Sequence, residues 1–315
     1  MESRFRNNII PCPDWAAIRG HFDQLPKPAR GCDDGGEIWR RGWIFRGHKQ
    51  EGYLLEPSIE RAYPTTDWDE AEYKALQEFQ SKAGLHMEAA RLPKPGDKLG
   101  WLAVMQHYGA PTRLLDFTYS PYVALYFALR NRKDGESAFA EVWGLDAAAL
   151  RVQAEKTSGE ADKAVRKHPG LLAPRGGRVS FAPEDVNTAL QQTQEDDKYW
   201  DMSIRRALNP CGARREHFNR RGFVAEALPT KHNPRLASQQ GVFLFNGASK
   251  RTFEESLELM MQNSKSEWYK RFRVPDAALR EIERELFQLN VHDLSLFPDT
   301  EGLAGVVRQR LRLHW

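Results

Sequence analysis

The pattern of apolar and polar positions predicts a chain in which strands and helices alternate. Short apolar runs bounded by charged or turn residues are typical of buried strands, and they occur at WIFRGH, AFAEVWGLD, GFVAEAL and GVFLFNG. Helical spacing is found at residues 66–90 and 99–108, in FEESLELMMQ, in DAALREIERELFQLN, and from about Thr300 onward. The pattern therefore predicts an α+β fold.

One predicted helix stands out because it is apolar around much of its circumference. It is PYVALYFALRN, and Ser120 followed by Pro121 gives it an N-cap and a first-turn proline. A helix with apolar residues on most sides is typically buried. We expect this helix to lie in the centre of the fold.

Residues 150–222 differ from the rest of the chain because they are polar and show no sustained period. We interpret this segment as an insertion within a single mixed domain at residues 43–315. Residues 1–42 are expected to form an N-terminal extension that packs on that domain.

Composition and motifs narrow the class of protein. The 315 residues are 41% hydrophobic and 28% charged, with a net charge of +3, which is typical of a folded chain rather than a disordered one. No apolar stretch approaches the roughly 18 residues of a membrane span, so a soluble, cytoplasmic protein without a membrane partner is expected. Three scattered cysteines and the absence of an H-E-x-x-H motif argue against a disulfide framework and a metal site.

A dense set of polar residues lies between two apolar helices, at residues 106–121. Buried polar groups need partners, so these side chains either pair with one another or line a binding site. One interpretation is an internal network in which Arg113 pairs with Asp116 and Ser120 caps a helix. His107 would then be a core histidine. The other interpretation is that these groups converge on a polar ligand.

Four segments resemble one known family, in the order WIFRG, QHYGAPTRLLDFTYSPYVALYFAL, NPRLASQQGVFLF and LSLFPDTEGLAGVV. Together they resemble the FRG domain, which is named for a Phe-Arg-Gly motif. The resemblance spans the chain from about Trp43 to Val307, and the segment 150–222 has no counterpart in it.

The FRG domain is in turn similar to the ADP-ribosyltransferase fold, which implies mixed sheets around a cleft with flanking helices. Those enzymes carry an Arg or His on a first strand, a Ser-Thr or Tyr motif on a second, and a Glu on a later strand. Arg46 matches the first position, and Thr118 with Ser120 matches the second. Gln239 and Gln240 stand where the Glu would lie, a departure that bears on the efficiency or acceptor class of any transfer.

The resemblance implies NAD as co-substrate and gives each matched residue an expected role. Arg46 would bind the pyrophosphate through its planar fork, with Gly47 letting the backbone approach, unless Arg46 merely pairs with a nearby acidic residue. Gln240 or Gln239 would bond the ribose, but an amide cannot act as a base. The catalytic candidates are Gln240, Asp116 and His107. The expected NAD contacts are Arg46, Gly47, Tyr108, Thr112, Arg113, Thr118, Ser120 and Gln239.

A basic stretch, NPCGARREHFNRRGF, interleaves arginines with His217, Phe218 and Phe223. This mixture suits a phosphate backbone with occasional base stacking, although a solvated charged face is the alternative. The candidate nucleic-acid contacts are Arg214, Arg215, Arg220 and Arg221.

These expectations lead to one main functional hypothesis and two alternatives. The main one is transfer of ADP-ribose from NAD to a macromolecule, with DNA or RNA favoured over protein. The resemblance implies a bacterial toxin or anti-phage effector, with an antitoxin or operon partner. The alternatives are a non-catalytic module that binds a nucleotide or nucleic acid, and an NAD glycohydrolase.

Overall fold

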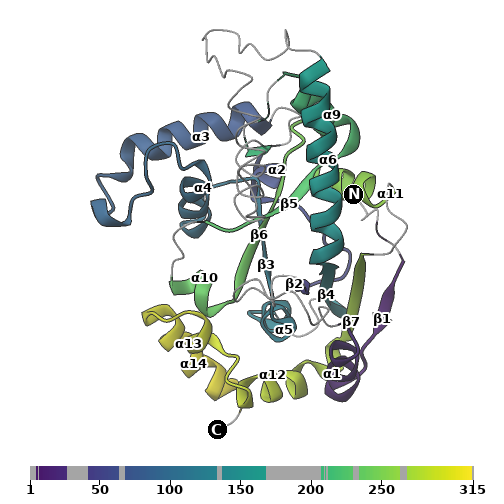
Figure 1. Cartoon of the computed structure of the whole chain (residues 1–315). Coiled ribbons are helices and arrows are strands. Elements are labelled where there is room, and N and C mark those ends of the chain that lie inside the picture. The colour runs from purple at the N-terminus through teal and green to yellow at the C-terminus, as the bar shows by residue number, and fades with distance from the viewer. Residues whose placement is uncertain are drawn as a thin grey trace, which may run out of the picture.

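The computed structural model describes residues 5, 7–26, 42–63, 68–132, 137–167, 207–208, 210, 212–229, 234–262 and 268–313. Seven strands in this part of the chain form one mixed sheet in the order β1, β7, β4, β2, β3, β6, β5 (Figure 1). Their bounds are β1 Ile9–Pro11, β2 Trp43–His48, β3 Leu114–Thr118, β4 Phe139–Asp146, β5 Val224–Ala227, β6 Gly241–Asn246 and β7 Tyr269–Pro275. The mixed α and β structure expected from the sequence is confirmed.

The sheet is continuous but has one weak junction. Strand β1 pairs parallel with β7, and every other neighbouring pair is antiparallel. Strands β2 and β4 pair along the whole of β2, and β3 pairs with β6 from Leu114 to Thr118. Strands β2 and β3 meet only where Phe45 lies opposite Thr118. Beyond that pair the two strands diverge, so the sheet has two parts joined at one point.

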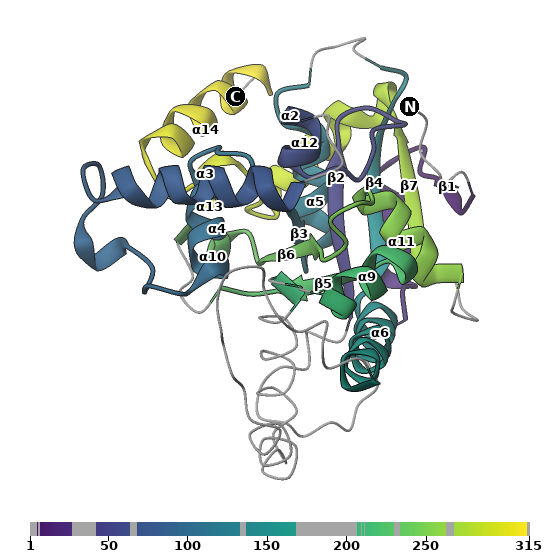
Figure 2. The same ribbon diagram turned by 90° about the horizontal axis from the view of Figure 1, so that it is seen from above.

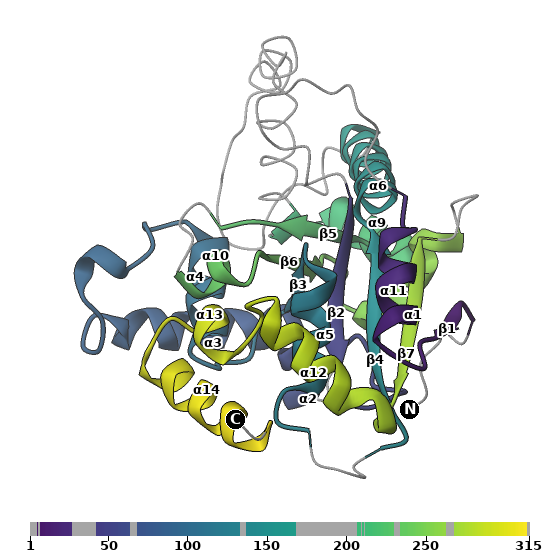
Figure 3. The same cartoon turned by 90° about the horizontal axis from the view of Figure 1, so that it is seen from below.

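Helices cover both faces of the sheet. Their bounds are α1 Trp15–Asp23, α2 Ser58–Ala62, α3 Trp68–Ala83, α4 Lys98–His107, α5 Pro121–Leu129, α6 Ala147–Lys167, α9 Gly212–Arg221, α10 Pro234–Ser238, α11 Phe253–Gln262, α12 Leu279–Gln288, α13 Asp293–Leu296 and α14 Thr300–Arg312. Two short 3-10 turns lie at Ala89–Arg91 and Asp276–Ala278. Helices α5, α12, α13 and α14 gather at one end of the molecule, and α6 lies on the opposite side of the sheet (Figures 1 and 2). Helices α3 and α4 project from the side of the sheet opposite β1 (Figure 3).

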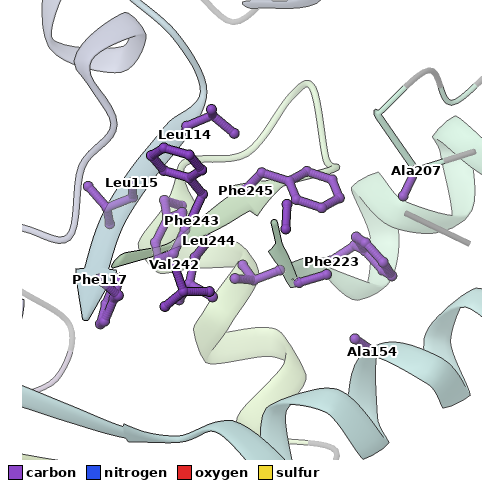
Figure 4. Close-up of a cluster of buried hydrophobic side chains, with 14 of the residues drawn as sticks. Leu114, Leu115, Phe117, Ala154, Ala207, Phe223, Val242, Phe243, Leu244 and Phe245 are labelled. Carbon is purple, nitrogen blue, oxygen red and sulfur yellow. The ribbon is translucent and has the colours of Figure 1, made fainter. Parts of the chain in front are cut away.

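Two hydrophobic clusters hold the layers together. On one face, Phe45 of β2 packs with α5, α12 and α1, together with the apolar residues of β4 and β7. On the other face, Trp143 packs with α6. Figure 4 shows part of this second cluster, in which Leu115 and Phe117 of β3 lie near β6, and Phe223 packs against Phe245 of β6. Burial on both faces explains why these central strands read as nearly continuous apolar runs.

Local signals predicted most of the elements correctly. The strand at Trp43, the helix of residues 99–108 and the buried helix after Ser120 are confirmed as β2, α4 and α5. The Ser120 side chain accepts a hydrogen bond from the Val123 amide, as an N-cap does. The predicted helix of residues 66–90 was too long, because α3 ends at Ala83, directly before Gly84.

Other elements escaped the pattern. Residues 150–167 belong to α6, in which Leu150, Ala154 and Ala161 are buried against the core. Small and polar residues in that helix hid a helical period that is present. Strand β7 was missed although Phe272 and Val274 alternate with arginines, which is the period of a strand.

No helix in the described ranges is both long and apolar enough to cross a bilayer.

Candidate functional site

Arg46 lies at the point where β2 and β3 diverge. Alternation along β2 sends Phe45 toward α5, whereas Ile44, Arg46 and His48 lie on the other face. The Arg46 Nη1 donates to the Asp116 carbonyl at 2.7 Å, and its Nε donates to His48 Nε2 at 3.2 Å. The guanidinium thus occupies a place where β3 no longer pairs with β2.

Arg46 forms no ion pair within the described part of the chain, so the expectation of an acidic partner is not met. Burial lowers the pKa of Arg46. The negative charge of Asp116 acts to raise this pKa, and the positive charge of Arg61 acts to lower it further. An arginine remains protonated despite such a shift. Arg46 is therefore a partly buried cation without a carboxylate contact, as a residue that binds an anionic ligand would be.

Gly47 has a structural role, and its expected part in ligand approach stays a prediction. A Cβ at this position would lie 2.0 Å from the Ala124 carbonyl oxygen and 2.5 Å from the Ala128 amide nitrogen. Both atoms belong to the backbone of α5. The glycine allows the central helix to pack directly on β2.

Asp116 is exposed although it lies in the middle of β3, at a position where β3 pairs with β6 but no longer with β2. Its Oδ2 accepts from Gln106 Nε2 at 2.8 Å, and Gln106 Oε1 accepts from the Thr112 hydroxyl at 2.6 Å. The same hydroxyl accepts from the Leu114 amide. This chain of bonds fixes one carboxylate oxygen of Asp116, and no described residue donates to the other. Gln106 is thus a site residue that sequence reasoning did not assign.

Arg113 does not pair with Asp116 and is not open to a ligand, so both expectations for it are wrong. Its Nε and Nη2 donate to Glu72 and Asp69, each at 2.6 Å, and Lys98 contacts Glu72 at 2.9 Å. Side chains alternate between the two faces of an extended chain, so residues three positions apart point in opposite directions. This separates the side chains of Arg113 and Asp116. Burial tends to raise the pKa of Glu72, but Arg113 and Lys98 outweigh it and lower that pKa to about 2.

The hydroxyls expected to contact NAD are engaged within the protein. Thr112 is fully buried. The Thr118 hydroxyl donates to the Gln239 carbonyl at 2.7 Å and accepts from the Ser120 amide at 3.1 Å. Ser120 caps α5, as the internal-network interpretation held. These groups shape the junction of β3, β6 and α5 rather than present donors to a ligand.

The two glutamines before β6 differ in their surroundings. Gln239 Nε2 donates to the Leu296 carbonyl at 3.1 Å, so its amide holds α10 to α13. Gln240 is exposed and has a left-handed φ of 48°, and its carbonyl accepts from the Tyr119 amide at 3.0 Å. Of the two, Gln240 is the more exposed.

His107 and Tyr108 end α4 and are exposed, so His107 is not a core histidine. Their rings contact edge to face with centroids 4.8 Å apart. Partial burial and the Arg235 charge lower the pKa of His107, and Asp299 opposes them. The neutral imidazole is therefore the main form at neutral pH, beside α10 and the start of α14.

The basic segment is only partly available to nucleic acid. Arg214 pairs with Asp162, and Arg215 contacts Asp69 at 3.4 Å. The expected base stacking is wrong, because Phe218 and Phe223 are fully buried and stack on each other at 4.3 Å. Arg220 and Arg221, at the end of α9, are exposed.

A cavity of about 250 Å³ lies elsewhere, between α5, α12 and α14. Its charged lining includes Arg130, Arg312, Asp293 and Glu283, which pair with one another. None of the residues expected in the site lines this cavity. Within the described ranges, no cluster of three or more His, Cys, Asp or Glu is arranged for a metal ion.

Comparison with known proteins finds a similarity to one family. The model of the FRG domain matches residues 41–137, which include β2, β3 and α5 and end just before β4. No curated protein and no solved structure gives a significant match. The similarity to ADP-ribosyltransferases therefore stays a prediction. Residues 41–137, with Arg46, Gln106 and Asp116 among them, are similar to the FRG domain.

Proposed function

We propose that this protein binds NAD and transfers its ADP-ribose to a macromolecule, with nucleic acid favoured over protein as acceptor. One observation carries the proposal. Arg46 donates to the backbone carbonyl of Asp116, a residue exposed in the middle of a central strand, and Arg46 forms no ion pair with any residue that the structure describes. An uncovered polar position in the centre of a sheet is typical of a binding site rather than of a core.

The fit of Arg46 to a pyrophosphate rests on its remaining donors. Nε and Nη1 are held by His48 and Asp116, and Nη2 has no described hydrogen-bond partner. A fixed guanidinium with free N–H groups binds phosphate oxygens at little cost in side-chain entropy. Strands β2 and β3 diverge next to the pair of Phe45 and Thr118 that joins them. This divergence supports placing the ligand there, beside Arg46.

Asp116 and Gln240 supply the groups that would act on the sugar and the acceptor. NAD brings the reactive bond between its ribose C1′ and the nicotinamide nitrogen, which breaks as the acceptor bonds to C1′. Asp116 would take the proton that the acceptor loses. Gln106 holds one carboxylate oxygen of Asp116, and the other oxygen would accept the proton. Gln240 would hydrogen-bond the ribose. The exposed Arg220 and Arg221 favour an anionic acceptor such as DNA or RNA.

A second function is favoured by one residue. Gln240 cannot neutralise positive charge at the sugar as a carboxylate does, which fits a module that binds a nucleotide without transfer. Hydrolysis of NAD by water is the remaining alternative. The role of a bacterial toxin or anti-phage effector with an antitoxin or operon partner is proposed from the resemblance alone, and it requires the transfer reaction.

The test uses NAD labelled on its adenylate phosphate, incubated with the protein and with DNA, RNA or protein acceptors. Transfer gives acid-insoluble label that only one of nuclease or protease digestion releases. Arg46→Met and Asp116→Asn are expected to abolish the label with the fold intact. Arg19→Met, on the exposed surface of α1, is the matched control and keeps full activity. Stabilisation by NAD without turnover would identify the binding module, and free nicotinamide without acceptor label would identify hydrolysis.

A further inference from the structure

The side chain of Arg46 is oriented by an unusual acceptor. Arg46 and His48 are two residues apart on β2, so alternation places both on the same face of the strand. The Arg46 Nε–H donates to His48 Nε2 at 3.2 Å, and the Asp116 carbonyl holds Nη1 from the other side. A histidine nitrogen accepts such a bond only when it carries no proton.

The surroundings of His48 keep it neutral. The His48 side chain is buried. This burial, together with the charges of Arg46 and Arg271, lowers the pKa of His48 well below 6.5. From β4, Glu141 lies opposite His48, but this carboxylate is engaged by Arg271 at 2.7 Å and by Arg273 at 3.6 Å.

The remaining groups around His48 come from the segment after β2. A backbone hydrogen bond with Tyr53 acts to raise the pKa of His48, and the positive charge of Arg61 acts to lower it further. The Tyr53 ring contacts the imidazole edge to face at 6.0 Å between centroids. A cationic, buried setting of this kind disfavours a second proton on the ring.

We propose that His48 is a positioning residue that holds the Arg46 guanidinium so that Nη2 faces a bound phosphate or pyrophosphate. Fixing Nε and Nη1 leaves Nη2 as the donor for the anion. Without an acceptor at residue 48, the buried Nε–H would lack a partner and the guanidinium would turn to find one. The identity of the ligand as NAD rests on the proposed function, whereas the anion site itself does not require transfer.

The first test concerns the unaltered protein and needs no ligand. In nitrogen NMR spectra of protein with labelled histidine, His48 is expected to be neutral at pH 7, with the proton on Nδ1 and none on Nε2. Free neutral histidine prefers the opposite tautomer, so the expected result is specific to this contact. A proton on His48 Nε2 would overturn the inference.

The second test compares two substitutions of equal length. His48→Gln keeps an acceptor near the Nε2 position, and His48→Met removes it. Binding of inorganic pyrophosphate and of ADP-ribose, measured by calorimetry, is expected to weaken about tenfold in the Met variant and less than about twofold in the Gln variant. The labelled Arg46 Nε–H signal is expected to shift in the Met variant and stay in the Gln variant. A purely structural role would affect folding in both variants without this difference.

The outcomes separate this inference from the transfer reaction. Pyrophosphate binding that depends on the acceptor at residue 48 supports the inference even where no ADP-ribose is transferred. Equal binding by the Met variant and the unaltered protein would overturn it. So would a failure of the unaltered protein to bind pyrophosphate or ADP-ribose at all.

Discussion

Replacing Arg113 by methionine is expected to destabilise the fold strongly, because Arg113 pairs with carboxylates that the core encloses. Methionine is similar in length and preserves most of the packing of the side chain. It leaves Glu72, whose side chain is 0% exposed, with Lys98 as its only described charged partner. Asp69 retains its contact with Arg215 at 3.4 Å.

The magnitude follows from the burial of the pair. Removing one partner of a buried ion pair costs about 3–5 kcal/mol, since the remaining charge is left without compensation. Lys98 remains 2.9 Å from Glu72 in the variant. The expected loss of unfolding free energy for Arg113→Met is therefore at the lower end of this range, about 3 kcal/mol. At roughly 2 °C or more per kcal/mol for a chain of this size, Tm falls by about 6 °C.

The effect has a defined pH dependence. The folded-state pKa of Glu72 is about 2, below its ordinary value of 4.5, so its pairing stabilises the fold above pH 4.5 and is lost as pH falls toward 2. Losing Arg113 raises the pKa of Glu72, so this carboxyl is protonated at higher pH in the variant. The difference in stability between the two proteins is therefore expected to narrow on acidification.

The assay is urea unfolding at pH 7 and at pH 4, with Arg113→Met/Glu72→Gln as the compensating double variant. Removing the uncompensated charge is expected to recover part of the lost stability in the double variant. Arg46→Met is the matched comparison, and its loss is expected to be small because no carboxylate is left unpaired. An unfolding free energy for Arg113→Met within about 1 kcal/mol of the unaltered protein would refute the reasoning.

Three further substitutions test the packing and the buried charges. Gly47→Ala is expected to lower the unfolding free energy by about 3 kcal/mol in urea titrations, since its Cβ meets the α5 backbone at 2.0 Å. Phe218→Ala is expected to cost about 3–5 kcal/mol, whereas a nucleic-acid contact would leave thermal stability unchanged. Burial raises the folded-state pKa of Glu60 from 4.5 to about 8, so stability is expected to fall as pH rises between those values. Glu60→Gln is expected to remove this dependence of stability on pH. A Tm of the Gln variant that still falls over the same pH range would contradict the prediction.

The elements that depend on neighbouring residues could be predicted from the sequence. Ser120 and Pro121 define the start of α5, because a cap and a first-turn proline act within one helical turn. The run around Arg46 defines β2, and alternation alone places His48 on the same face as Arg46. The FRG similarity was also visible in the residues, and the matched range includes Arg46 and Asp116.

Which polar groups contact one another could not be predicted from the sequence, because it depends on the packing of distant segments. Arg113 pairs with Glu72, 41 positions away, rather than with Asp116 nearby, because α3 brings a carboxylate to the buried side of the chain. A side chain at Gly47 would meet the backbone of α5, a contact that the local sequence does not predict. Local periodicity fixes the direction of a side chain, but its partner depends on elements that pack against it from distant parts of the chain, and burial then sets the strength of each contact.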